Sequence, residues 1–119
     1  MSIDPIELHH AEVWEVDFEP TRGREIQKIR PAIIVSVDAV GRLPLKLVAP
    51  ITGWKDSLEK NLWHVRLDPD QYNGLTKTSS VDTLQLRGMD HERFIRKLGY
   101  IVSPKMLEIK AAISLIIGA

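Results

Sequence analysis

The sequence predicts a mainly β domain, a small curled sheet or barrel closed by one C-terminal helix. Five or six short apolar or alternating stretches are separated by Pro and Gly punctuation, which is typical of strands. Apolar positions recur at clear helical spacing only after Ser103. At 119 residues the chain is one domain in length and needs no disulfide. We therefore expect residues 1–119 to form a single domain, with residues 1–11 a flexible or extended N-terminal segment.

The first half of the chain contains three stretches that predict strands. Residues 13–18 alternate apolar and acidic side chains, the pattern of a half-buried strand. Residues 31–38 form an apolar, β-branched run suited to a buried strand, and residues 43–49 form a second. We expect a turn over 38–42 between these two runs, and Pro50 to end the later one.

The second half contains weaker signals. Residues 51–62 are largely polar and predict a surface loop, whereas residues 63–67 alternate again and predict a strand. Residues 79–87 indicate a further strand. Residues 91–97 predict a helical turn, and residues 98–102 one last short strand.

A helix is expected at the C-terminus. Ser103 is a good N-cap, Pro104 suits the first helical position, and Gly118 is a plausible stop. The apolar residues that predict its buried face are Met106, Ile109, Ile113 and Ile116.

The charge balance excludes one way of binding nucleic acid. Sixteen basic and sixteen acidic side chains give zero net charge, which argues against a protein that coats nucleic acid through bulk electrostatics. The distribution is uneven, because residues 1–20 hold six acids and no Lys or Arg, while residues 21–30 hold four bases and one acid. A nucleic-acid site would therefore be local, with a short footprint and a modest salt dependence.

Several chemistries are excluded by residue type. The absence of cysteine rules out a disulfide scaffold, a thiol nucleophile, a zinc ribbon and an iron–sulfur site. His9 and His10 are adjacent, and neither His64 nor His91 has a second ligand at an obvious spacing, so we expect no metal site. These histidines are interpreted as a mobile terminal pair and two surface imidazoles. Gly23 stands alone in its loop, so no nucleotide fingerprint and no cofactor is expected.

The chain also lacks the features of a membrane or secreted protein. No apolar run approaches the roughly 20 residues that span a bilayer, and the first ten residues lack the pattern of a secretory signal. We therefore expect a cytoplasmic protein without a membrane partner.

The loop over 21–30 is the strongest candidate for a binding site. It combines Gly23, the single acid Glu25 and several cations between two expected strands. Arg30 precedes Pro31, and a residue before proline is held in extended geometry, so its guanidinium leaves a relatively fixed backbone. Such a group suits bidentate binding of a phosphate. The alternative on these residues alone is a solvated charged loop.

A resemblance then narrows the function. The stretch 12–25, followed by 28–36, resembles the opening of the MazF/PemK family of toxin endoribonucleases. Further matches follow in the family's order and extend the resemblance to about residues 12–118: Val48 to Thr52, Gly74-Leu75 with Ser79 to Val81, Gln85 to Arg87, and the helix from Met106 to Gly118.

The resemblance implies a fold and an activity. Family members adopt the SH3-like small barrel of MazF and CcdB toxins with a C-terminal helix, form homodimers, and pair with a cognate antitoxin protein in type II toxin–antitoxin systems. They cleave single-stranded RNA, chiefly mRNA, at short sequences without a metal, and so inhibit translation and growth. The RNA's 2′-hydroxyl attacks the neighbouring phosphorus, leaving a 2′,3′-cyclic phosphate and a 5′-hydroxyl.

The resemblance also implies roles for individual residues. By position in the motifs, Arg30 and Thr52 match the family's catalytic pair, and Glu25 is the nearest candidate for a base. RNA contacts are expected from Arg24, Lys28, Trp54, Gln85 and Arg87, although Trp54 could equally be ordinary packing or an antitoxin contact. Leu84 stands where many members carry Asp, and Arg24 replaces a frequent Ser, which bears on the RNA sequence recognised.

Two other functions fit the same fold. One is a non-enzymatic toxin that binds a protein such as DNA gyrase, as CcdB proteins do, and the other is an inactive barrel that serves only as an interaction module. A gyrase binder does not require Glu25, Arg30 and Thr52 together, so their joint presence favours the nuclease.

Overall fold

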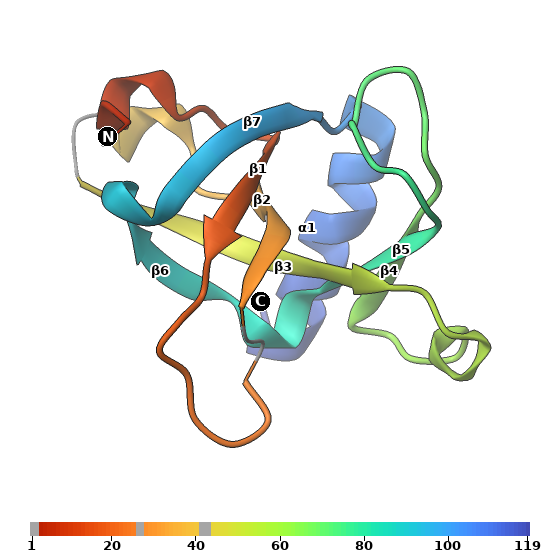
Figure 1. Ribbon diagram of the computed structural model, residues 1–119. Coiled ribbons are helices and arrows are strands. Elements are labelled where there is room, and N and C mark those ends of the chain that lie inside the picture. Colours follow the sequence, from red (N-terminus) through yellow and green to blue (C-terminus); the bar gives the residue numbers. More distant parts are fainter. Residues whose placement is uncertain (1–2, 26–27, 41–43) are drawn as a thin grey trace.

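The computed structural model describes residues 3–25, 28–40 and 44–119. In this part of the chain, an antiparallel sheet of seven strands curls around a core and is followed by one α-helix (Figure 1). The strands follow the order β4-β5-β3-β2-β1-β7, and β6 pairs with β3 outside this path. The mainly β fold with a C-terminal helix is therefore confirmed. The elements are β1 (Glu12–Asp17), β2 (Ile29–Ile34), β3 (Leu45–Gly53), β4 (His64–Leu67), β5 (Ser79–Asp82), β6 (Arg87–Asp90), β7 (Phe94–Tyr100) and α1 (Ser103–Ile117).

Strand β3 organises the sheet because it changes partners along one edge. On one side it pairs with β2, with Ala32 opposite Pro50. On the other side its first half pairs with β6 and its last three residues, 51–53, pair with β5. Pro50 lies between these two paired stretches, a place where a residue without an N–H is tolerated. The expectation that Pro50 ends the strand is wrong, and Thr52 is consequently a strand residue rather than a loop residue.

The core has two parts, and the helix covers one of them. Met106, Ile109 and Ala112 of α1 are buried against apolar side chains of β1 to β5. Ile113 packs against the same cluster from a partly buried position. In Figure 1 the helix lies behind the sheet on the side of β4 and β5. Because side chains alternate along a strand, burying Ile51, Val65 and Val81 turns their neighbours to the opposite face.

A second apolar cluster fills the other face of β1 and β2. Phe18 of the loop after β1 is fully buried there, and Trp14 of β1 meets Phe94 of β7 edge to face, with ring centroids 6.1 Å apart. Ala32, Ile33 and Ile34 of β2 are all buried, because β2 has one cluster on each side. This explains why its sequence is a continuous apolar run rather than an alternating one.

In two places, short turns capped by an aspartate carboxylate make the observed elements differ from the expected ones. The single strand expected over 79–87 is wrong: the Asp82 carboxylate accepts from the N–H of Leu84 and starts a 3₁₀ turn at Thr83–Gln85, after which β6 begins. The Asp90 carboxylate starts a similar turn at His91–Arg93. The helical turn expected over 91–97 therefore ends at residue 93, and β7 replaces the rest.

The helix ends were predicted almost correctly. Gly118 closes α1 in the left-handed region with φ of 73°, as expected. The start lies one residue earlier than expected, because Ser103 is helical and the carbonyl of Val102 accepts from Lys105 and Met106. Ser103 is thus not the N-cap.

The N-terminal segment is more structured than expected where it is described. Residues Pro5–Glu7 form a 3₁₀ turn, and Leu8 is buried in the second cluster. Part of the turn expected over 38–42, and the start of the strand expected over 43–49, lie outside the described residues. Within the described residues, no helix is both long and apolar enough to cross a membrane.

Candidate active site

The ends of β2 and β3 bring the two principal site residues together. Ala32 of β2 is opposite Pro50 of β3, so two residues further along this antiparallel pair Arg30 approaches Thr52. Both side chains line one pocket of about 420 Å³, together with Gly53, Trp54, Lys55, Leu58 and His64. We call this hollow the Arg30 pocket. It contains three of the eight residues that the sequence singled out, namely Arg30, Thr52 and Trp54.

Four other expected residues line a different pocket. Arg24 and Glu25 of the β1–β2 loop face the segment 84–87, which contains Gln85 and Arg87, across a hollow of about 430 Å³ that we call the Gln85 pocket. Two contacts hold the side chains of the segment 84–87 in place. The amide of Gln85 donates to Asp82 at 3.1 Å, and the Arg87 guanidinium lies over the ring of Phe18, 5.8 Å from its centre.

The structure therefore separates Glu25 from the other two expected catalytic residues. The Glu25 carboxylate accepts a hydrogen bond from the backbone N–H of Arg22, which closes the exposed turn at the tip of the β1–β2 loop. It lines the Gln85 pocket and is not among the residues that line the Arg30 pocket. In this arrangement the carboxylate stabilises the loop.

Lys28 lies at the base of the same loop and lines neither pocket. Its backbone has φ of 68°, its N–H donates to the Glu19 carboxylate at 2.8 Å, and its carbonyl accepts from Phe18. These bonds hold the chain where it enters β2, two residues before Arg30. The position of Lys28 thus supports the fixed geometry expected for Arg30.

His64 is a site residue that the sequence did not reveal. It lines the Arg30 pocket, its Nδ1 lies 2.7 Å from the hydroxyl of Ser80, and its Nε2 lies 3.9 Å from the Asp82 carboxylate. The His64 and Asp82 side chains are only 12% and 10% exposed. The expectation of a surface imidazole is wrong, because the ring is nearly buried and the pairing of β4 with β5 sets His64 directly opposite Asp82. Strand pairing, which was not predictable from spacing, supplied the missing partner.

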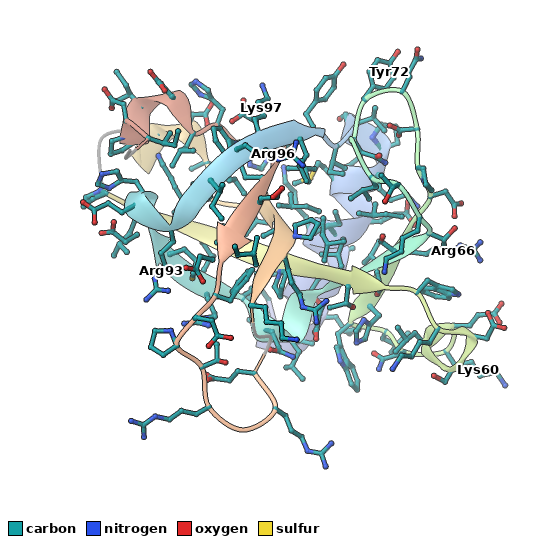
Figure 2. All side chains as sticks on the ribbon, viewed as in Figure 1. Lys60, Arg66, Tyr72, Arg93, Arg96 and Lys97 are labelled. Carbon is teal, nitrogen blue, oxygen red and sulfur yellow. The ribbon has the colours of Figure 1, made fainter. Side chains whose placement is uncertain are left out.

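Lys77 is a second residue that the sequence did not reveal. Its Nζ lies beside Gly53, 3.4 Å from where a Cβ on that glycine would stand. Arg30 also lines a neighbouring hollow of about 350 Å³ that contains Lys77, Arg96 and Glu15, and Arg96 is paired with Glu15 at 2.7 Å. Figure 2 shows Arg96 on β7. Positive charge thus gathers around Arg30 from segments far away in the sequence.

One group of potential metal ligands lies elsewhere. Among the described residues, Asp90, His91 and Glu92 place ligand atoms within 4.8 Å of one another. They form the turn before β7 and line neither named pocket. The Asp90 carboxylate already accepts from the N–H of Glu92 and lies 3.4 Å from His91 Nδ1. This group is explained by turn formation.

A family model and a curated relative each match most of this chain. Residues 9–117 match the family model described as PemK-like, MazF-like toxin of type II toxin–antitoxin system. The endoribonuclease MazF of Staphylococcus saprophyticus is 32% identical over 112 residues, which cover 93% of this chain and 92% of the relative.

Solved structures agree with the fold at lower identity. MazF (Form-I) from Deinococcus radiodurans superposes with a TM-score of 0.76 at 21% identity, covering 93% of this chain and 96% of that one. Mycobacterium tuberculosis toxin MazF-mt6 gives 0.73 at 21% identity, covering 90% and 96%. An endoribonuclease in complex with its cognate antitoxin, from a mycobacterial species, gives 0.74 at 18% identity, covering 92% and 94%. The small toxin barrel expected from the sequence is therefore confirmed.

Proposed function

We propose that this chain, which belongs to the family of PemK-like, MazF-like toxins of type II toxin–antitoxin systems, cleaves single-stranded RNA without a metal. The observation that carries the proposal is the Arg30 pocket, where a guanidinium, a hydroxyl and an indole line one hollow at the ends of two paired strands. These groups match a flexible substrate with an anionic backbone and unpaired bases. Cleavage of mRNA would place the activity in the cytoplasm.

The proposed reaction is an internal transfer within the RNA. The 2′-hydroxyl gives up its proton to a base as its oxygen forms a bond to the adjacent phosphorus, the bond from phosphorus to the 5′-oxygen breaks, and a proton passes to that leaving oxygen. Arg30 binds the phosphate and stabilises the charge that builds up on it, because a guanidinium stays protonated and donates in a fixed fork. Thr52 donates its hydroxyl to a phosphate oxygen, and Lys77 adds positive charge beside Gly53.

Proton transfer has two candidate groups in this chain. Glu25 is the base that the family resemblance suggests, but its carboxylate binds the Arg22 N–H in the other pocket. His64 is the imidazole that lines the Arg30 pocket, and imidazole is the side chain that most often serves as a general acid or base. The location of His64 favours it over Glu25.

The remaining expected residues are proposed as RNA contacts. Arg24, Gln85 and Arg87 line the Gln85 pocket, where amide and guanidinium groups can bind base edges and phosphates. Trp54 lines the Arg30 pocket and offers an aromatic face for an unpaired base. Lys28 adds charge at the base of the loop.

Two protein partners belong to the proposal. The first is a second copy of this chain, and the second is a cognate antitoxin encoded by a short reading frame just upstream, whose partly acidic and disordered segment would occupy the RNA site. Expression of the chain alone should arrest growth, and co-expression of the upstream frame should relieve the arrest. Harmless expression of the chain alone would count against this part of the proposal.

The activity test uses a long single-stranded RNA in excess chelator. The native protein should cut it, and Arg30→Ala and Thr52→Ala should cut it at least about 100-fold more slowly, the usual cost of removing a donor to a developing negative charge. Lys110→Ala, which removes an exposed charge from α1, is the matched control and should cut like the native protein. Intact RNA with the native protein, or equal cutting by Arg30→Ala, would overturn the proposal. Intact RNA is also what a non-enzymatic toxin would leave.

A further inference from the structure

A further pocket adjoins the Arg30 pocket. It has a volume of about 600 Å³ and lies between β4, the segment 54–62 and α1. Trp54 and His64 line both pockets, so the two adjoin at the indole. Its volume is within the usual range for small-ligand sites, about 300–1,000 Å³. We call it the Trp54–helix pocket.

Arg66 of β4 covers the indole in this pocket. Its guanidinium carbon lies 5.3 Å from the centre of the Trp54 ring, a cation–π contact. Arg66 Nε donates to the Asp68 carboxylate at 3.2 Å, and the Thr78 hydroxyl donates to the same oxygen at 3.3 Å. The guanidinium is therefore held from two sides although its side chain is 54% exposed. Figure 2 shows Arg66 extending from β4 at the edge of the molecule.

The sheet register shows where Arg66 lies relative to Thr52 of the Arg30 pocket. Thr52 of β3 is opposite Ser80 of β5, and Ser80 is opposite Arg66 of β4. The three residues form one row across the face that does not meet the core, so two strand spacings, about 10 Å, separate the backbones of Thr52 and Arg66. An RNA strand bound at Thr52 can reach this distance with a neighbouring nucleotide.

The charges of the pocket indicate which part of a nucleotide it would take. Arg66 and Lys105 are balanced by Glu59 and Glu108, and Lys105 is paired with Glu108 at 2.7 Å. A lining without net charge does not select a phosphate. A fixed guanidinium lying on an indole instead offers flat surfaces, on which unpaired bases stack.

We propose that Trp54 and Arg66 form a stacking site for one unpaired base of the RNA, next to the nucleotide at which the chain is cut. This inference rests on the proposed RNA cleavage and adds a specificity-determining residue, Arg66, to it. Asp68 is a positioning residue, because it touches the base only through Arg66.

The test compares base preference at each position around the cut. A pool of single-stranded RNAs with a randomised segment is cut in excess chelator, and the fragment ends are sequenced. Trp54→Ala and Arg66→Lys should both flatten the preference at the same single position and raise KM about 5- to 150-fold, the range for losing one stacked base. For Arg66→Lys the rate at saturating RNA should stay within about twofold of native, since Arg66 is not among the residues that line the Arg30 pocket.

Two further variants keep the test independent of folding. Asp68→Asn alters an exposed side chain and should reproduce part of the Arg66→Lys effect, because the bond to the guanidinium loses its negative partner. Lys110→Ala should match the native protein in KM and in base preference. Arg66→Lys keeps the charge and loses the planar group, so a purely electrostatic role would leave it like the native protein.

The outcomes separate this inference from the proposed function. Native cutting with unchanged KM and base preference in Trp54→Ala and Arg66→Lys would overturn the stacking site alone. The two variants could instead cut RNA like the native protein while the co-expressed upstream antitoxin no longer relieves their growth arrest. That result would assign Trp54 and Arg66 to the contact with a protein partner. Absence of cutting by the native protein would overturn the proposed function and the stacking site together.

Discussion

At the scale of single residues, His64 is the side chain whose role the structure changes most. We expect His64→Gln to lower the cleavage rate at saturating RNA more than Glu25→Gln does, by about 100-fold or more for a lost proton-transfer group. The reason is location, because His64 lines the pocket of Arg30 and Thr52 whereas Glu25 lines the Gln85 pocket. Glutamine can still bond to Ser80, which limits any effect on the fold.

The measurement for this comparison is a pH–rate profile of the native protein and both variants. Loss of one limb of the profile in His64→Gln would identify the imidazole as the titrating group. A larger loss in Glu25→Gln, with a nearly native profile in His64→Gln, would return the role to the carboxylate. Thermal unfolding of each variant serves as the control for folding.

The sequence identified Arg30 and Thr52 as candidate site residues, but it did not identify the side chains that lie around them. Arg30 was predictable from the proline that follows it and from the family motif, and the motif alone carried Thr52. His64 reaches the Arg30 pocket, and Lys77 reaches the neighbouring hollow that Arg30 also lines. Neither was predictable, because the strand pairing or loop path that brings each of them there depends on the whole sheet. Trp54 was predicted as an RNA contact, and it lies in the largely polar stretch 51–62. Its contact with Arg66 depends on that strand pairing and on the path of the chain after β3.

At the scale of elements, a buried carboxylate links β1 to β7. Glu12 accepts from the Trp14 indole and the His9 N–H, and pairs with Lys97 at 2.8 Å. Burial alone would raise the pKa of Glu12, but these hydrogen bonds and the Lys97 charge outweigh it and hold the pKa below 4.5. Because the folded pKa is the lower one, the stabilisation is complete above the unfolded value of 4.5 and is lost as the pH falls through the folded pKa.

We therefore expect Glu12→Gln to lower the free energy of unfolding at pH 7 by about 1–3 kcal/mol. The gap between native and variant should narrow below about pH 4, as the native carboxylate is protonated. Urea unfolding at pH 7 and pH 3 measures both values. Glu15→Gln is the control, since the pair of Glu15 with the exposed Arg96 should contribute at most about 1 kcal/mol. A gap that is equal at both pH values would contradict this account of Glu12.

The long loop between β4 and β5 is held against β7 by close backbone contact. A Cβ on Gly99 would stand 2.0 Å from the carbonyl oxygen of Tyr72, and one on Gly74 2.1 Å from that of Leu98. The N–H of Tyr100 donates to the same Tyr72 carbonyl at 2.9 Å. The loop carries Lys77 and Thr78 to the site, and the Thr78 carbonyl accepts from the N–H of Trp54. Glycine is required at both contacts.

Gly99→Ala should therefore lower stability by about 1–3 kcal/mol and slow RNA cleavage as well, because the loop must move away from the site. Gly88→Ala is the matched control, as a Cβ there meets nothing within 4 Å. Thermal melts and cleavage rates well below the melting temperature measure the two effects. Native stability and activity in Gly99→Ala would show that the loop contact is dispensable.

The errors in element prediction have two physical causes. Pro50 was expected to stop a strand, and residues 79–87 were expected to form one. In the structure both outcomes follow from long-range pairing around β3 and from one capping carboxylate, Asp82. Alternation predicted β1 and β4 well, because that signal is local. The apolar run predicted the existence of β2 but placed it over residues 31–38, whereas the strand is Ile29–Ile34 and includes Arg30.

At the scale of the whole molecule, zero net charge and local positive charge around Arg30 predict weak salt dependence. We expect the slope of log binding constant against log salt for a short 2′-O-methyl RNA to be about −1.5 to −3, which corresponds to two to four phosphate contacts on a single strand. Fluorescence anisotropy over a salt series measures it. A slope steeper than about −5 would indicate a protein that coats the RNA backbone, contrary to the short footprint inferred from the charge distribution.

The chemistry of the fragment ends tests the central claim most directly. Native protein and single-stranded RNA are incubated in excess chelator, and the ends of the products are analysed by mass spectrometry. Attack by the RNA's own 2′-hydroxyl at the Arg30 pocket predicts 2′,3′-cyclic phosphate and 5′-hydroxyl ends, absent with Arg30→Ala. Fragments with 5′-phosphate ends, or RNA that is cut only after a metal is restored, would contradict it.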